Sequence, residues 1–129
     1  MKRRFRLRRE SDFQRALKGR RVFSGEAFVA LARPRPEGEW RIGVAVSRQL
    51  KGSVRRNRAR RRLREAARTQ IIEQDWPPEE RGIPYDVVLI ARPAALLLPA
   101  AALQREAREV RSRLSAAERR PDSLESTRS

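Results

Sequence analysis

The sequence predicts an α+β fold, a single domain in which a small mixed sheet is packed by helices in the order α-β-β-β-α-β-α. Three observations lead to this fold class. A short helical pattern precedes several strand patterns between residues 21 and 47, and a long basic helical pattern follows. The most apolar strand pattern, residues 85–91, comes next and is followed by a final helical pattern. We expect one folded domain over residues 1–114 and a disordered tail over 115–129.

The first predicted elements are an arm and a short helix. Residues 1–9 alternate basic and apolar side chains, which indicates an extended arm whose apolar residues contact the body. Ser11 and Gln14 have the spacing of a capping box, so we expect Ser11 to be the N-cap of the helix. Gly19 is the expected C-terminal stop. The apolar side of this helix would be formed by Phe13, Ala16 and Leu17.

Strand patterns then dominate. Residues 22–23 and 27–32 are separated by Ser24-Gly25, and residues 34–39 form a cluster of turn residues rich in proline and glutamate. Residues 40–47 form the next strand pattern, whose second half is apolar on both faces. The simplest arrangement is an antiparallel hairpin that pairs the strands on either side of the 34–39 turn.

The segment 48–68 predicts a strongly basic amphipathic helix that ends near Ile71 or Ile72. It contains ten basic residues, and Glu65 is its only acid. A narrow apolar seam is expected at Ala59, Leu63, Ala66, Ala67 and Gln70, and the opposite side carries Asn57, Arg61, Arg64 and Arg68. Because neighbouring guanidinium groups repel one another, a helix with this face requires a polyanionic partner, for which a phosphate backbone is the best candidate.

The last elements are a strand and a helix. Four consecutive apolar residues at the centre of 85–91 indicate a strand buried on both faces. Residues 75–84, which precede it, form a proline-rich connection. Pro99 can open the final helix. Its buried side is expected at Leu103, Ala107, Val110 and Leu114.

The composition narrows the function classes. The formal charge is +16 and the pI about 11.8, and nearly all the basic residues are arginines, which suits RNA better than a lipid surface. The chain has no cysteine and no histidine, and its acids form no metal-binding cluster in the sequence. No apolar run has the roughly 20 residues of a membrane span, and no hydrophobic segment follows the basic N-terminus. We therefore expect a cytoplasmic protein.

The basic segment resembles the signature of a known family. RIGVAVSRQLKGSVRRNRARRRLREAAR, residues 41–68, is similar to the motif of the bacterial ribonuclease P protein subunit, with Arg56-Asn57-Arg58 as its core and Val54 before it. The resemblance extends to LRRESDFQRALKGRR, residues 7–21, and to YDVVLIARPAA, residues 85–95. One loop departs from the common pattern: Gly52 stands one place later than is usual in the family.

The resemblance implies a small subunit that assists a catalytic RNA in removing the 5′ leader from precursor tRNA. It implies that the RNA performs the chemistry with Mg²⁺, so that the protein alone is inactive, has no catalytic residue and binds no cofactor through identifiable residues. No protein partner and no membrane contact are indicated. It also implies a left-handed crossover between parallel strands, against the general right-handed rule.

The resemblance assigns candidate sites to two groups of residues. The expected contacts to the catalytic RNA are Arg48, Lys51, Arg55, Arg56, Asn57, Arg58, Arg60, Arg61, Arg64 and Arg68. The expected cleft for the leader consists of Phe13, Leu17, Val29 and Leu31. Leucines stand at two positions where aromatics are frequent in the family, so arginine and shape should contribute more to leader binding here.

Some alternatives remain open from the residues alone. Phe13 is explained equally well as a core residue and as a platform for the leader. Phe28 and Val29 point to opposite faces of a strand, so only one of them can face the cleft. An alternative function is that of a ribosomal or other structural RNA-binding protein, which would bind RNA through the same positively charged surface. A protein nuclease acting alone is poorly supported, since the usual catalytic side chains are missing.

Overall fold

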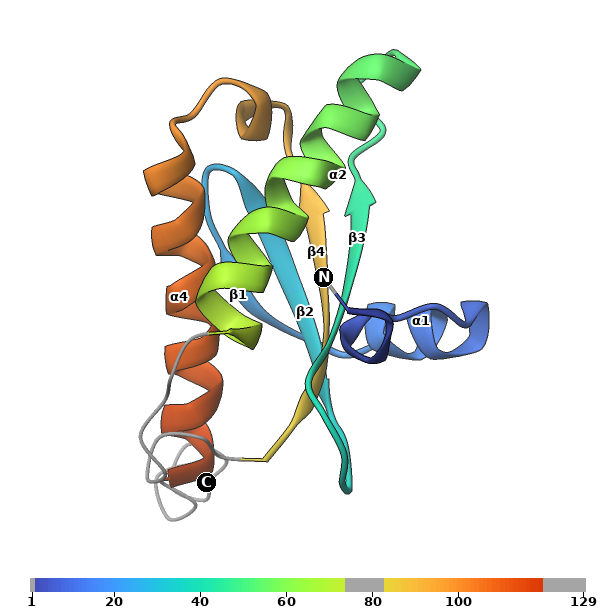
Figure 1. The fold of residues 1–129 in the computed structure, drawn as a ribbon, viewed down its shortest axis with the longest axis vertical. Helices are drawn as coiled ribbons and strands as arrows, with labels where there is room; N and C mark the ends of the chain where they lie inside the picture. Colours follow the sequence, from blue (N-terminus) through green and yellow to red (C-terminus); the bar gives the residue numbers. More distant parts are fainter. Residues whose placement is uncertain (1, 74–82, 120–129) are drawn as a thin grey trace.

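The computed structural model describes residues 2–73 and 83–119, and it has the predicted α+β architecture (Figure 1). The predicted order of helices and strands is confirmed. The helices are α1 (Glu10–Leu17), α2 (Ser53–Ala67) and α4 (Ala100–Arg119), and the strands are β1 (Arg20–Ser24), β2 (Phe28–Pro34), β3 (Arg41–Val46) and β4 (Tyr85–Ala91). Short 3-10 turns occur at Arg3–Phe5 and Pro93–Leu96, and α2 continues as a π-helical turn, Arg68–Ile72.

The four strands form one mixed sheet in the order β1-β2-β4-β3. Strand β4 pairs antiparallel with β2 and parallel with β3, so that Leu89 lies between Ala30 and Val44. The predicted hairpin between the strands around the 34–39 turn is therefore wrong. The reason is that β4, whose first five residues are all buried, takes the central place that would otherwise join those two strands.

The connection from β3 through α2 to β4 is left-handed, as the family resemblance implies. In Figure 1 both strands point upward, α2 crosses in front of them, and β4 lies to the left of β3. A right-handed crossover would place β4 on the other side of β3.

The sheet carries helices on both faces. Helices α2 and α4 cover one face, where Phe28, Leu63, Leu89 and Leu103 are fully buried in the main core. Helix α1 packs on the opposite face against β2 and β4. There a smaller cluster is formed by Leu7, Ala16 and Val88, with Phe13, Leu17 and Ile90 packed against it.

Helix α1 begins two residues earlier than predicted, because its N-cap is Arg9 and not Ser11. Arg9 is its N-cap without a side-chain capping bond, so the predicted capping box at Ser11 is wrong. Gln14 instead donates to the Glu10 carboxylate across one helical turn, at 2.8 Å. The helix ends at Leu17, before Gly19 as predicted. Gly19 lies so close to β2 that no side chain fits there. A Cβ at Gly19 would lie 2.4 Å from the main-chain oxygen of Ala32.

The N-terminal arm runs along β3, which is an edge strand. Arg6 forms a parallel bridge with Ile42, and the Leu7 amide donates to the Ile42 carbonyl at 3.0 Å. Leu7 is buried, and Phe5 is half-buried beneath the guanidinium of Arg4. The arm docks through its apolar residues, as expected, and covers part of an exposed sheet edge. It is not extended throughout, because Arg3–Phe5 form a 3-10 turn.

Helix α4 is longer than predicted. Its predicted apolar side is buried, and the helix continues through Arg119. Ser115 is buried, so the expected start of a disordered tail at residue 115 falls inside a packed helix. The remainder of that tail, 120–129, and most of the proline-rich 75–84 connection lie outside the described residues. Within the residues that are described, no helix is long and apolar enough to cross a membrane.

Candidate nucleic-acid interface

Helix α2 holds the largest group of predicted RNA-binding residues. Its predicted apolar seam, Ala59, Leu63, Ala66 and Ala67, is buried against the body of the protein. The helix begins at Ser53, so Arg48 and Lys51 lie in the preceding loop rather than on the helix. Burial of the seam leaves Arg55, Arg58 and Arg61 exposed to solvent.

The outer side of α2 contains a shallow hollow of about 420 Å³. It is lined by Val54, Asn57, Arg60, Arg61 and Arg64. The Arg60 guanidinium donates to the Asn57 side-chain oxygen at 2.7 Å, which fixes the orientation of both groups. Four of the predicted residues thus meet in one concave, positively charged surface, which we call the α2 hollow. Such a surface can bind a phosphate backbone through charge-assisted hydrogen bonds.

Arg56, the first residue of the Arg-Asn-Arg core, points into the protein. Its Nη1 donates to the main-chain oxygens of Ser47 at 3.0 Å and Leu50 at 2.9 Å. These carbonyls belong to the loop between β3 and α2, where Gly52 adopts a positive φ of 91°. The structure therefore gives Arg56 a role in fixing the loop, which the sequence pattern did not reveal.

Arg64 of α2 is influenced by the charge of Arg6 on the N-terminal arm. Burial lowers its pKa below the ordinary arginine value, and the nearby guanidinium groups of Arg6 and Arg60 lower it further. The group remains charged at neutral pH, so several positive charges are held close together here. An anion bound at this point would relieve their repulsion.

Arg68 differs from the other outer arginines because its charge is already paired. Its guanidinium contacts the Glu65 carboxylate and lies 2.7 Å from that of Glu73. Hydrogen bonds to these two acids raise the pKa of Arg68 and lower that of Glu65. Arg68 therefore contributes less free positive charge to the surface than its place in the pattern suggests.

Four further predicted residues are exposed, and their side chains make no hydrogen bond or ion pair with the described part of the chain. They are Arg48, Lys51, Arg55 and Arg58. Arg62, which the sequence analysis did not assign to the interface, donates at 2.5 Å to the main-chain oxygens of Ala95 and Leu98. It joins α2 to the turn before α4, so only some arginines of the run are available to a partner.

The arm adds basic residues that sequence reasoning did not assign to a site. A hollow of about 270 Å³, which we call the arm hollow, is lined by Arg3, Arg4, Arg6, Arg8, Arg9, Asp12 and Arg41. The density of arginines in residues 1–9 is the signal in the sequence that could have indicated this site. Arg6 connects this arm electrostatically to Arg64 of α2. The basic surface is thus built from two segments far apart in the chain.

An ion-pair network fixes α1 against the sheet beside this hollow. Arg41 of β3 donates to both carboxylate oxygens of Asp86 at 2.8 Å, and it contacts Asp12 of α1 at 3.2 Å. The hydrogen bond from Arg41 to Asp86 raises the pKa of Arg41, and Asp86 itself is buried. The network determines where the α1 side chains lie over the sheet.

The four predicted leader-cleft residues share the α1 face of the molecule. Val29 and Leu31 are half-buried on β2 opposite Ile90 and Val88, whereas Phe28 is fully buried in the main core. Phe13 and Leu17 are half-buried on α1. Val29 therefore faces the side that the resemblance favoured.

Phe13 packs directly onto the sheet at a glycine. A Cβ at Gly43 of β3 would lie 2.7 Å from the Phe13 ring, so the ring occupies the space that a side chain at this position would need. Phe13 contacts the small core and also keeps part of its ring accessible. The contacts support a packing role for Phe13, and the accessible part of the ring leaves the predicted leader contact a prediction.

Comparisons with known proteins agree on one family. The model of the Ribonuclease P family matches residues 1–115. The Ribonuclease P protein component of Symbiobacterium thermophilum is 38% identical over 111 residues, which cover 85% of this chain and 90% of the relative. The Ribonuclease P protein component of Ruegeria pomeroyi is 42% identical over 91 residues, which cover 68% of this chain and 67% of the relative.

Solved structures show the same fold. The RNase P protein of Staphylococcus aureus superimposes with a TM-score of 0.61 at 25% identity, covering 82% of this chain and 91% of that one. The RNase P protein of Thermotoga maritima has a TM-score of 0.63 at 24% identity, covering 84% of this chain and 96% of that one. At this identity the similarity supports a shared fold only.

Proposed function

Because this chain belongs to the ribonuclease P protein component family, we propose that it assists a catalytic RNA in removing the 5′ leader from precursor tRNA. As a protein component of ribonuclease P it is the RNA-binding subunit of an enzyme of tRNA 5′ processing. The observation that best supports the finer proposal is the basic surface formed jointly by α2 and the arm. We assign this surface to the catalytic RNA.

The leader is proposed to bind on the α1 face. Phe13, Leu17, Val29 and Leu31 offer half-buried apolar side chains on this face, and the arm arginines border it through Asp12 and Arg41. A single strand could rest its bases on the apolar side chains and its phosphates near the arginines. This arrangement separates leader contacts from those to the catalytic RNA.

The chemistry is proposed to belong to the RNA and its Mg²⁺ ions. The sequence supplies neither histidine nor cysteine. Among residues 2–73 and 83–119, no group of three or more acidic residues is placed to hold a metal ion. These residues do not fit a resident metal, and we assign no step to one. We also place the protein in the cytoplasm, where tRNA is processed in bacteria.

The decisive experiment is reconstitution. The protein, the catalytic RNA and precursor tRNA are combined at low Mg²⁺ concentration, and cleavage at the mature 5′ end is followed. We expect strong stimulation over the RNA alone and no cleavage by highly purified, RNA-free protein. A structural RNA-binding protein would bind RNA without stimulating cleavage. Cleavage by the protein alone would contradict the assignment of chemistry to the RNA.

A further inference from the structure

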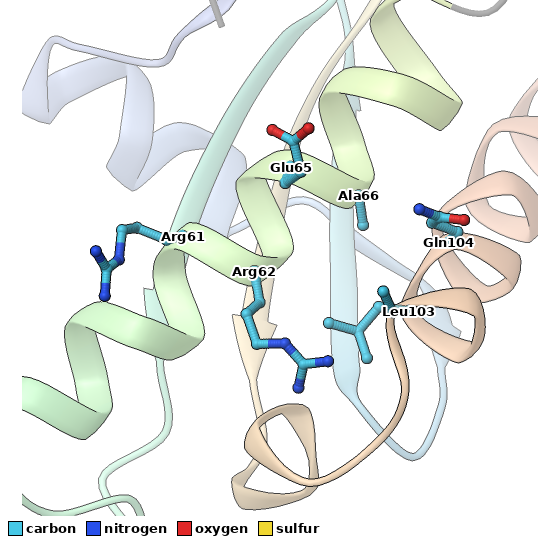
Figure 2. A pocket seen from close by; sticks show the side chains of 7 residues that line it. Arg61, Arg62, Glu65, Ala66, Leu103 and Gln104 are labelled. Carbon is cyan, nitrogen blue, oxygen red and sulfur yellow. The ribbon is translucent and has the colours of Figure 1, made fainter.

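A second pocket lies between α2 and α4, on the side of α2 next to the α2 hollow. It has a volume of about 250 Å³ and a mostly apolar interior. Figure 2 shows Ala66, Leu103 and Gln104 facing the space between the two helices. The cavity exists because Ala66 and Ala100 are too small to fill it. Since pockets for drug-sized ligands measure about 300–1,000 Å³, the space suits a smaller group.

The polar groups around this pocket differ in their availability. The Arg62 guanidinium is held by two carbonyls, and Glu65 is paired with Arg68. Gln104 is half-buried, and its side-chain amide makes no hydrogen bond to the described residues. A side-chain amide offers one acceptor and two donors, so it can pair with the edge of a base.

The pocket is continuous with the phosphate-binding surface through one residue. Arg61 lines both the pocket and the α2 hollow, and in Figure 2 its side chain points away from α4. The α2 hollow and the pocket are therefore adjacent at Arg61, so a strand whose phosphates bind at Arg61 would lie next to the pocket. An apolar cavity beside a row of phosphate-binding arginines fits a nucleotide better than it fits an apolar peptide.

We propose that the α2–α4 pocket binds an unpaired nucleobase of the RNA strand whose phosphates lie against the α2 hollow. The base inserts between Ala66, Ala100 and Leu103, the Arg62 guanidinium offers a flat surface for stacking, and Gln104 pairs with the base edge. The amide matches the neighbouring donor and acceptor of adenine best. This inference rests on the proposed RNA-binding function and adds base recognition to it.

The test uses two short RNAs of equal charge. One is a hexamer of adenylate and the other is a hexamer with the same phosphates and abasic riboses. Binding is measured by fluorescence anisotropy at one salt concentration. The main variant is Ala100→Leu, which fills the pocket from the exposed first residue of α4. Its matched control is Ala101→Leu, since Ala101 is equally exposed on the same turn but does not line the pocket.

Filling the pocket should weaken binding of the adenylate hexamer by about tenfold, the loss of one stacked base, and leave the abasic hexamer nearly unchanged. Ala101→Leu should match the wild type with both RNAs. Gln104→Ala should reduce any preference for the adenylate hexamer over a uridylate hexamer. The affinities of wild type and Ala100→Leu for the adenylate and abasic hexamers together form a double-mutant cycle, which measures the coupling between the pocket and the base.

Equal affinity of Ala100→Leu and wild type for adenylate would overturn the proposal, as would equal losses with both hexamers. If Ala100→Leu does not fold, as judged by thermal unfolding, the Gln104→Ala result decides alone, and an unchanged base preference refutes the pocket. Failure of the pocket would leave reconstituted cleavage intact. Failure of the proposed function would abolish that stimulation while hexamer binding could still be measured.

Discussion

Arg56 donates a hydrogen bond of 3.0 Å to the main-chain oxygen of Ser47, which lies nine residues earlier, directly after β3. A second bond of 2.9 Å reaches Leu50. The Arg-Asn-Arg core therefore has two parts. Arg56 points inward and fixes the loop, while Asn57 and Arg58 face solvent.

The two arginines of this core should respond differently to mutation. Arg58→Ala should leave the melting temperature unchanged, weaken binding to the catalytic RNA, and reduce the slope of log affinity against log salt by about one ion. Arg56→Ala should lower the free energy of unfolding by about 1–3 kcal/mol, because charge-assisted hydrogen bonds to the loop are lost. Thermal unfolding and salt-dependent binding of both variants provide the measurement. Identical effects on stability would contradict the division of roles.

Arg61 and Arg68 provide a second matched pair on the outer side of α2. Arg61→Ala should reduce RNA affinity and the salt slope more than Arg68→Ala, because Glu65 and Glu73 already neutralise Arg68. Glu65→Gln should remove part of that neutralisation and increase the RNA affinity of the protein. Salt titrations of the three variants test this. Equal slopes for the two arginine variants would show that the acids release Arg68 when RNA binds.

The arm should contribute to RNA binding even though it is far from α2 in the sequence. Arg3 and Arg4 are exposed and line the arm hollow, so replacing both by glutamine should reduce the salt slope by about two ions without changing stability. Arg105→Gln is the control, since Arg105 is exposed on α4 away from both basic hollows. An arm variant that behaves like this control would exclude the arm from the interface.

Phe13→Ala should distinguish the leader site from plain core. The ring is half-buried over Gly43, so the variant should lose about 1–3 kcal/mol of stability, less than a fully buried Phe. It should lose affinity for precursor tRNA while affinity for mature tRNA, which has no leader, barely changes. Both tRNAs should be titrated alongside thermal unfolding. Equal losses for the two tRNAs with a large drop in melting temperature would make Phe13 a core residue only.

Much of the local structure could be predicted from the sequence, because side-chain periodicity is a local property. The seam at Ala59 and Leu63, the doubly buried strand at 85–91 and the helix stop before Gly19 all follow from residue type and spacing. The positive charge of the 48–68 run follows from composition alone. These features require no knowledge of which elements become neighbours.

The tertiary structure decided which strands pair and whether each arginine contacts the protein or remains available to a partner. Strand β4 separates β2 from β3 because long-range burial of its apolar residues outweighs the short loop that favoured a hairpin. Arg56 donates to carbonyls of the loop before α2 and Arg62 to a carbonyl of the turn before α4, and the charge of Arg6 on the arm lowers the pKa of Arg64. Arginines look alike in a sequence, and their partners are set only when the chain has folded.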